Sequence, residues 1–167
     1  IKKENPELVG LSVLSFNYSQ AIKIARFIKE HSDAKILFGG VHVILSPEEV
    51  IGNKEVDIIC LGEGEKVFEG LLKNKLDCKN VKGIWYKKDG EIIKNPHVKL
   101  IEDLNNLPFP EWDDFELDKY FLINNNHLPI MASRGCPYNC TYCSNHALKK
   151  NLEGKYVRFR NVDNVIE

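Results

Sequence analysis

The sequence has 167 residues, of which 43% are hydrophobic and 28% are charged, and its formal net charge is −1. This composition excludes a disordered or collagen-like chain, and the near-neutral charge argues against a large nucleic-acid-binding surface. No apolar run approaches the roughly 18 residues that a membrane span requires. The length predicts about one domain. However, the chain starts at Ile1 and ends in what reads as the first turn of a helix, so we expect a segment of a longer protein.

Three strand-like segments alternate with three helix-like segments in the first half of the chain. Apolar runs bounded by polar residues predict buried strands at 8–15, 35–38 and 56–61. Helical spacing and capping sequences predict helices around 21–28, after Ser46-Pro47-Glu48-Glu49, and around 67–72. Ser19 is expected to cap the first of these helices. Three βα units predict a parallel sheet, and since a complete doubly wound domain has about five or six strands, we expect an incomplete one.

The pattern changes after the third helix. Two strand-like runs at 81–86 and 91–94 flank Asp89-Gly90, a dipeptide typical of β-hairpins. Residues 96–126 show little sustained periodicity and contain several turn-forming residues, so we interpret them as a linker packed on the surface.

The last part of the chain again has strand-like segments. Strands are predicted at 127–133 and 155–160, and Asn161 is expected to cap a final helix. The predicted regions are an α/β domain at 1–76, a hairpin and linker at 77–127, and a third region at 128–167.

The sequence has five cysteines with uneven spacing. This is not the even framework of a small secreted disulfide protein, so we expect a reducing cytoplasm. Cys60 lies in an apolar run and is expected to be a small core residue, whereas Cys78 lies in a polar stretch and is expected to be a surface thiol. The other three have the spacing C-x3-C-x2-C, and they are Cys136, Cys140 and Cys143.

Three thiolates on one tight loop can bind metal in two ways. They can ligate a cubane iron–sulfur cluster and leave one iron open for a small molecule. They can also form a zinc knuckle, for which His146 is the candidate fourth ligand. A predicted strand precedes the loop, Gly135 and Pro137 flank its first cysteine, and an aromatic residue precedes its last cysteine, which together favour the cluster.

The segment 134–143, with the sequence RGCPYNCTYC, closely resembles the signature of radical S-adenosylmethionine (SAM) enzymes. The resemblance implies that Cys136, Cys140 and Cys143 hold a 4Fe-4S cluster, that the open iron binds SAM, and that Tyr142 lies against the adenine. It also implies reductive cleavage of SAM, hydrogen abstraction from an unactivated C–H position, and an electron donor such as flavodoxin or ferredoxin. Residues 128–167 are then expected to be the first βα unit of a radical SAM (β/α) barrel.

The first half resembles the cobalamin-binding domain that precedes the radical SAM barrel in one large class. The residues that carry this resemblance follow the predicted strands, and they are Ser12, Leu14, Gly39, Gly40, Gly62, Glu63 and Gly64. The resemblance implies that these loops accept the nucleotide tail of cobalamin. Open α/β sheets do bind ligands at the carboxyl ends of their strands, where glycines let a bulky ligand approach the backbone. His42 is expected to be a loop histidine rather than a cobalt ligand.

Together the two resemblances predict an α/β protein, with an incomplete Rossmann-like cobalamin-binding domain followed by the start of a radical SAM (β/α) barrel. The expected activity is that of a radical SAM enzyme, a cobalamin-dependent methyltransferase or cyclase, acting on a small molecule that the sequence does not identify. Two alternatives stay open: a radical SAM enzyme with a cobalamin-free scaffold domain, and a non-enzymatic zinc or iron–sulfur binding module. We expect this segment alone to be inactive, because a barrel closes only with several more βα units. Nucleic acid is not expected as a partner.

Overall fold

A computed structural model describes residues 1–113, 115–127 and 130–166 of the chain. These residues form two compact units. The first unit contains residues 1–100 and 139–154, and the second contains residues 101–138 and 155–167. Within the described residues, no helix has the length and apolar character that crossing a membrane would need.

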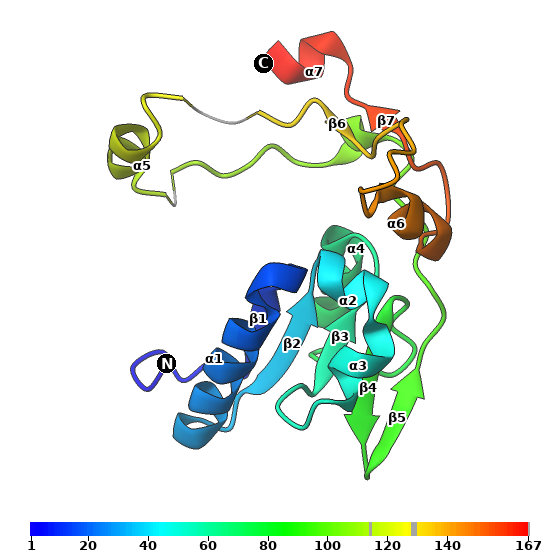
Figure 1. The fold of residues 1–167 in the computed structure, drawn as a ribbon. Helices are drawn as coiled ribbons and strands as arrows, with labels where there is room; N and C mark the ends of the chain where they lie inside the picture. Colours follow the sequence, from blue (N-terminus) through cyan, green and yellow to red (C-terminus); the bar gives the residue numbers. More distant parts are fainter. Residues whose placement is uncertain (114, 128–129, 167) are drawn as a thin grey trace. The chain divides into compact units, whose positions relative to one another are not determined.

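A five-stranded mixed sheet forms the centre of the first unit (Figure 1). Its strands lie in chain order: β1 (Leu8–Ser12), β2 (Lys35–Gly39), β3 (Ile58–Cys60), β4 (Ile84–Lys88) and β5 (Glu91–Lys94). The pairs β1–β2 and β2–β3 are parallel, as the βα alternation predicts, and β3–β4 and β4–β5 are antiparallel. The predicted hairpin is therefore confirmed. Its first strand also extends the sheet, because Ile59 of β3 pairs with Trp85 of β4.

Helices cover both faces of this sheet. They are α1 (Tyr18–His31), α2 (Val41–Leu45), α3 (Pro47–Gly52) and α4 (Gly64–Lys73), and a short 3-10 helix, η1 (Ser15–Asn17), precedes α1. The cap predicted at Ser19 is wrong, because α1 begins at Tyr18 with Asn17 at its N-cap. Ser46 does occupy the N-cap of α3 with Pro47 in the first turn, although its side chain makes no capping hydrogen bond.

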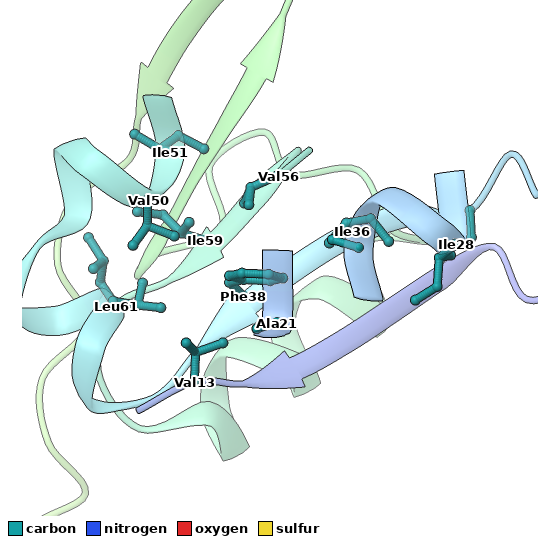
Figure 2. Close-up of a cluster of buried hydrophobic side chains, with 13 residues drawn as sticks. Val13, Ala21, Ile28, Ile36, Phe38, Val50, Ile51, Val56, Ile59 and Leu61 are labelled. Atoms are coloured by element: carbon teal, nitrogen blue, oxygen red, sulfur yellow. The ribbon is translucent and has the colours of Figure 1, made fainter. Parts of the chain in front are cut away.

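The two faces bury separate apolar clusters, because successive side chains of a strand point to opposite sides. Ile36 and Phe38 of β2 join residues of α1, α2 and α3 in one cluster, part of which is drawn in Figure 2. Leu37, which lies between them in the sequence, instead packs with Val67 and Leu71 of α4 on the other face. A sheet that is covered on both faces explains why β2 reads as an uninterrupted apolar run.

Ion pairs join α1 to the loop before β3. The Lys29 ammonium lies 2.6 Å from one carboxylate oxygen of Asp57, and the other oxygen accepts the backbone N–H of Ile36 at 2.7 Å. Arg26 donates to the nearly buried carboxylate of Glu55 at 3.0 Å. These contacts lie at the amino ends of the strands, opposite the edge at which the loops after β1, β2 and β3 leave the sheet.

The segment 139–154 also belongs to the first unit. Its helix α6 (Asn145–Asn151) contacts α2, and the Asn151 side-chain amide donates to the Ile44 carbonyl at 3.1 Å. The backbone N–H of Leu100 donates to the Glu153 carbonyl at 2.8 Å. The helix that follows the cysteine loop is thus attached to the helix that follows β2.

The second unit has little regular structure. It contains η2 (Leu104–Asn106), α5 (Leu117–Ile123), α7 (Val162–Ile166) and an antiparallel pair of two-residue strands, β6 (Ser133–Arg134) and β7 (Arg158–Phe159). The guanidinium of Arg158 is buried and donates to the Ile101 carbonyl at 2.7 Å.

Several predictions for the second unit need correction. The segment interpreted as a linker contains the helix α5, whose two turns are too short to show sustained periodicity in the sequence. The strands predicted at 127–133 and 155–160 are much shorter in the described residues, and residues 128–129 lie outside them. The apolar residues before β6 are exposed, with Ile130 at 68%, so they lack the packing that would extend the strand. The α/β fold class itself is confirmed.

Candidate functional site

A cavity of about 420 Å³ opens at the carboxyl ends of the first three strands. We call it the strand-end cavity. Its lining comes from β1, β2, β3, the loops that follow β2 and β3, and α4. It consists of Gly10, Leu11, Ser12, Leu37, Gly39, Gly40, Cys60, Gly62, Gly64 and Phe68. The volume lies within the range of about 300–1,000 Å³ that small-molecule sites usually have. The parallel strands explain the location, because their loops leave the same edge of the sheet and diverge there.

Glycines create the space in this cavity, since half of the lining residues have no side chain. The constraint is strongest at Gly40, whose φ is +102°. A Cβ at Gly40 would lie 2.7 Å from the carbonyl oxygen and 2.8 Å from the nitrogen of Val13. That carbonyl accepts the N–H of His42, and the Val13 N–H donates to Gly39 at 2.7 Å. The loops after β1 and β2 are therefore held together at a separation that only glycine permits.

Gly62 lies on the loop after β3 and also has a conformation that favours glycine. Its φ is +111°, and a Cβ there would lie 2.9 Å from a methyl group of Val98. Glu63 follows as the N-cap of α4, and Gly64 begins the helix. The first turn of α4 therefore lies directly at the cavity, where its backbone N–H groups favour negatively charged or polar atoms.

The deep part of the cavity is apolar. Leu37 and Cys60 are 1% and 3% exposed, whereas Ser12 is exposed at the rim. Burial, reinforced by the negative charge of Glu65, raises the pKa of the Cys60 thiol to about 12. The thiol is therefore neutral at physiological pH and is a poor nucleophile and metal ligand.

Phe68 forms a side wall of the strand-end cavity. Its ring atoms lie 3.6 Å from the positions that a Cβ would take on Gly10 and on Gly64. The ring thus fills the space that these two glycines leave between β1 and the start of α4. It is half-buried and packs against the apolar cluster of that sheet face.

Five of the residues proposed from the sequence as cobalamin contacts line this cavity: Ser12, Gly39, Gly40, Gly62 and Gly64. Leu14 and Glu63, both of which the structure describes, do not belong to its lining. The sequence interpretation missed Gly10, Leu11, Leu37, Cys60 and Phe68. Only Gly10 had a usable signal, because a glycine inside a strand often marks a close approach. The role of these residues in ligand binding remains a prediction.

His42 lies beside the cavity loops, on α2 rather than in a loop. Its Nδ1 is 3.1 Å from the Ser15 hydroxyl, and its ring centroid is 4.4 Å from that of Tyr18. Among the described residues, its buried Nε2 has no hydrogen-bond partner. His42 does not belong to the residues that line the strand-end cavity.

The cysteine loop follows β6. Gly135 has a φ of +83°, and a Cβ there would lie 2.1 Å from the Tyr156 carbonyl oxygen, so only glycine can precede Cys136 in this conformation. Further along, the N–H of Cys143 donates to the Cys140 carbonyl at 3.0 Å, which places these two cysteines on one turn. Cys140 is exposed, Cys136 and Cys143 are half-buried, and all three are free thiols.

The cluster interpretation of this loop remains a prediction. In the part of the chain that the structure describes, no three His, Cys, Asp or Glu side chains converge as metal ligands would. The donor chemistry nevertheless suits iron, since thiolates are the ligands that iron–sulfur clusters use. The ring of Tyr142, which is expected to contact adenine, is 91% exposed and so is accessible to a ligand.

The two remaining cysteines are both buried. Cys60 is a core residue, as its apolar surroundings predicted. The prediction of a surface thiol at Cys78 is wrong, because this residue is 4% exposed and burial raises the pKa of its thiol. Cys78 packs in the same apolar cluster as Cys60, next to Val81, because the hairpin after it folds back onto the sheet.

The comparisons with known proteins address the first half most directly. Residues 1–72 match the family described as B12 binding domain. This segment belongs to that family. The matched region contains β1 to β3 and every residue that lines the strand-end cavity, so the cavity lies entirely within the matched segment.

The whole chain is similar to longer proteins. It is 32% identical over its full length to an uncharacterized methyltransferase of Pyrococcus horikoshii, of which it covers 37%. Over 83% of its length it is 28% identical to the cobalamin-dependent radical SAM methyltransferase TokK of Streptomyces tokunonensis, of which it covers 22%. The resemblance to radical SAM enzymes with a cobalamin-binding domain is thereby confirmed.

A solved structure supports the same relationship. The cobalamin-dependent SAM radical enzyme OxsB, with aqua-cobalamin and SAM bound, matches 98% of the chain with a TM-score of 0.70 and 26% identity. The chain covers 22% of OxsB. The match therefore spans both the segment with the strand-end cavity and the segment with the cysteine loop.

Proposed function

We propose that the protein containing this chain is a cobalamin-dependent radical SAM enzyme that transfers a methyl group to an unactivated carbon of a small molecule. The observation that carries the proposal is the strand-end cavity, which lies within the B12 binding domain. The cysteine loop supports the radical SAM part of the proposal, and the similarity of the chain to named methyltransferases supports the reaction type. Cyclisation is the alternative reaction within the same class.

The strand-end cavity fits part of cobalamin. Gly39, Gly40 and Gly62 provide backbone without side chains at the rim, and the Ser12 hydroxyl can donate to or accept from a polar ligand there. The apolar floor can hold an uncharged ring and exclude water from it. Cobalamin bound at this site would supply the protein with a carrier for a methyl group.

The cysteine loop has the complementary role in this proposal. The thiolates of Cys136, Cys140 and Cys143 would hold a 4Fe-4S cluster, and Tyr142 would contact the adenine of SAM. Such a cluster supplies the electron for the reductive cleavage of SAM. An external donor such as flavodoxin or ferredoxin and a reducing cytoplasm are parts of the same proposal.

The test uses the full-length protein that contains this chain, reconstituted anaerobically with iron, sulfide and hydroxocobalamin. We expect corrinoid absorbance to stay with the protein after gel filtration, and 5′-deoxyadenosine to form when SAM and a reductant are added. A protein that forms 5′-deoxyadenosine but retains no corrinoid would instead have a scaffold domain. A protein that carries zinc and forms no 5′-deoxyadenosine would be a binding module.

A further inference from the structure

The segment that carries two of the three loop cysteines is packed into the first unit. Cys140 and Cys143 share one turn, and α6 begins two residues after Cys143. The carbonyl of Ser144, at the N-cap of α6, accepts backbone N–H groups from the first turns of this helix. Leu148 is the buried side chain of α6, and the helix contacts α2. The position of the turn with the two cysteines therefore depends on how α6 is held.

The first link between α6 and the strand-end cavity runs through α2. Ile44 lies in the last turn of α2, where carbonyl groups have no partner further along the helix. The side-chain amide of Asn151 donates to the Ile44 carbonyl at 3.1 Å. At its other end α2 begins directly after Gly40, which lines the cavity, and the backbone N–H of His42 donates to the carbonyl of Val13. Asn151 thus bonds to a helix whose opposite end joins the cavity loops.

The second link runs through residues 96–100, which we call the strap. The backbone N–H of Leu100 donates to the carbonyl of Glu153 at 2.8 Å, two residues after α6 ends. A methyl group of Val98 lies 2.9 Å from the position that a Cβ would take on Gly62. Gly62 lines the cavity, so the strap connects the end of α6 to the loop after β3.

Both links belong to the first unit. Cys140 is exposed, so a cluster bound there would restrain a turn that otherwise has little packing. A restrained turn holds α6, and α6 holds the loops after β2 and β3 through α2 and the strap. When one ligand has already restricted the loops, a second ligand loses less conformational freedom on binding and therefore binds more tightly.

We propose that Asn151 is a positioning residue that couples the cysteine loop to the strand-end cavity, so that a cluster on the loop and cobalamin in the cavity raise each other's affinity. This inference rests on the proposed function, which assigns these ligands to the two sites. The coupling is reciprocal, because each ligand must change the affinity of the other by the same factor. Asn151 carries it because its amide joins α6 to the backbone of α2.

The test measures the binding of hydroxocobalamin to the full-length protein by equilibrium dialysis. Apoprotein is compared with protein in which the cluster has been reconstituted anaerobically from iron and sulfide, without SAM. We expect the dissociation constant to be at least about fivefold lower in the protein with the cluster. Equal dissociation constants would overturn the inference and leave the proposed function intact. If the protein takes up no cluster, or if neither form binds hydroxocobalamin, the proposed function fails.

Substitutions at Asn151 locate the coupling. Asn151→Ala removes the amide, so the ratio of the two dissociation constants should fall to about twofold or less, with the strap carrying the remainder. Asn151→Gln keeps an amide donor and should restore part of the ratio. A purely structural effect of the substitution would weaken binding to both forms of the protein and leave the ratio unchanged.

Asn74→Ala is the matched control. The side-chain amide of Asn74 donates to the carbonyls of Asp77 and Lys79, which lie in the loop that follows α4. This loop is part of neither link, so the ratio of the dissociation constants should stay the same. An unchanged ratio in Asn151→Ala, or an equal fall in both alanine variants, would contradict the role of Asn151.

Discussion

The carbonyl oxygen of Val13 lies 2.7 Å from the position that a Cβ would take on Gly40. The loop after β1 therefore approaches the loop after β2 closely at this point. The hydrogen bonds of Val13 with Gly39 and His42 hold the two loops together. The two loops cannot separate without losing these bonds. The width of the cavity opening therefore depends on this backbone contact as well as on the side chains that line the cavity.

The first prediction follows from this contact. Gly40→Ala should destabilise the protein by roughly 1–3 kcal/mol, because the residue has a positive φ and its new methyl group would collide with Val13. Cobalamin binding should weaken as well, since the loops must move apart. Thermal unfolding and a corrinoid titration measure the two effects.

Gly52→Ala is the matched control. Gly52 ends α3, and a Cβ there would have no heavy atom within 4 Å. Stability should be unchanged or rise by up to about 1 kcal/mol, because alanine restricts the unfolded chain. If both alanine variants lose stability and cobalamin affinity to the same extent, the result contradicts the special role that we assign to Gly40.

The second prediction concerns the cysteine loop. Cys140→Ala should remove iron from the reconstituted full-length protein and abolish 5′-deoxyadenosine, since a cluster ligand would be lost. Cys78→Ser should keep both, because Cys78 is buried in the apolar cluster of the first unit. Iron and sulfide analysis and product chromatography measure the outcome. Persistent SAM cleavage in the Cys140 variant would contradict the ligand assignment.

The third prediction concerns alkaline pH. Burial raises the pKa of the Cys60 thiol from its ordinary value of 9.0 to about 12, so the folded protein holds this proton more tightly than the unfolded chain does. The protein should therefore lose stability as the pH rises from about 9 toward 12, by at most about 1.4 kcal/mol per pH unit from this group. Cys60→Ser should reduce the loss between about pH 9 and 12, because the serine hydroxyl does not titrate in this range.

Denaturant unfolding at each pH measures this effect. The Cys78 thiol also has a pKa raised by burial, so its replacement by serine should give a change in the same direction. If the two variants and the unmodified protein lose the same stability as the pH rises, the prediction is wrong and other groups control the alkaline transition.

The fourth prediction separates the fold from the site. Asp57→Ala removes the acceptor for both the Lys29 ammonium and the Ile36 N–H, so it should cost about 2–3 kcal/mol of stability. The affinity of the folded protein for cobalamin should stay the same, because Asp57 lies at the amino end of β3 and the cavity lies at the other end.

The exposed ion pair between Glu69 and Lys73 provides the control for the Asp57 variant. Glu69→Ala removes the partner of Lys73 on the surface of α4, and neither stability nor affinity should change measurably. Chemical denaturation and corrinoid titration are both required. A weaker cobalamin affinity in the folded Asp57 variant would show that the amino edge does influence the site.

Local sequence patterns predicted much of the first unit correctly. The apolar runs of β1 to β3 and the spacing of α1 and α4 depend on which side chains each element buries, and that pattern is visible within a few residues. The turn at Asp89-Gly90 is equally local, because both residues have positive φ, which these residue types tolerate. Regular structure in 96–126 was missed because α5 is short and its side chains are mostly exposed.

Contacts between residues far apart in the chain could not be predicted from the sequence. Pairing of β4 with β3 joins segments about two dozen residues apart, and no local pattern specifies which sheet edge a hairpin will meet. The burial of Cys78 follows from that pairing, so its polar neighbours in the sequence gave the wrong prediction.

The sequence by itself determined the alternation of strands and helices, the order of the two family motifs, and the glycines that follow the strands. Each of these depends on neighbouring residues or on recognisable spacing. Only the tertiary structure decided that Gly10, Cys60 and Phe68 join Gly40 around one cavity. These residues lie on two strands, a loop and a helix. They come together because parallel pairing brings the carboxyl ends of the strands to one edge and α4 packs against that edge.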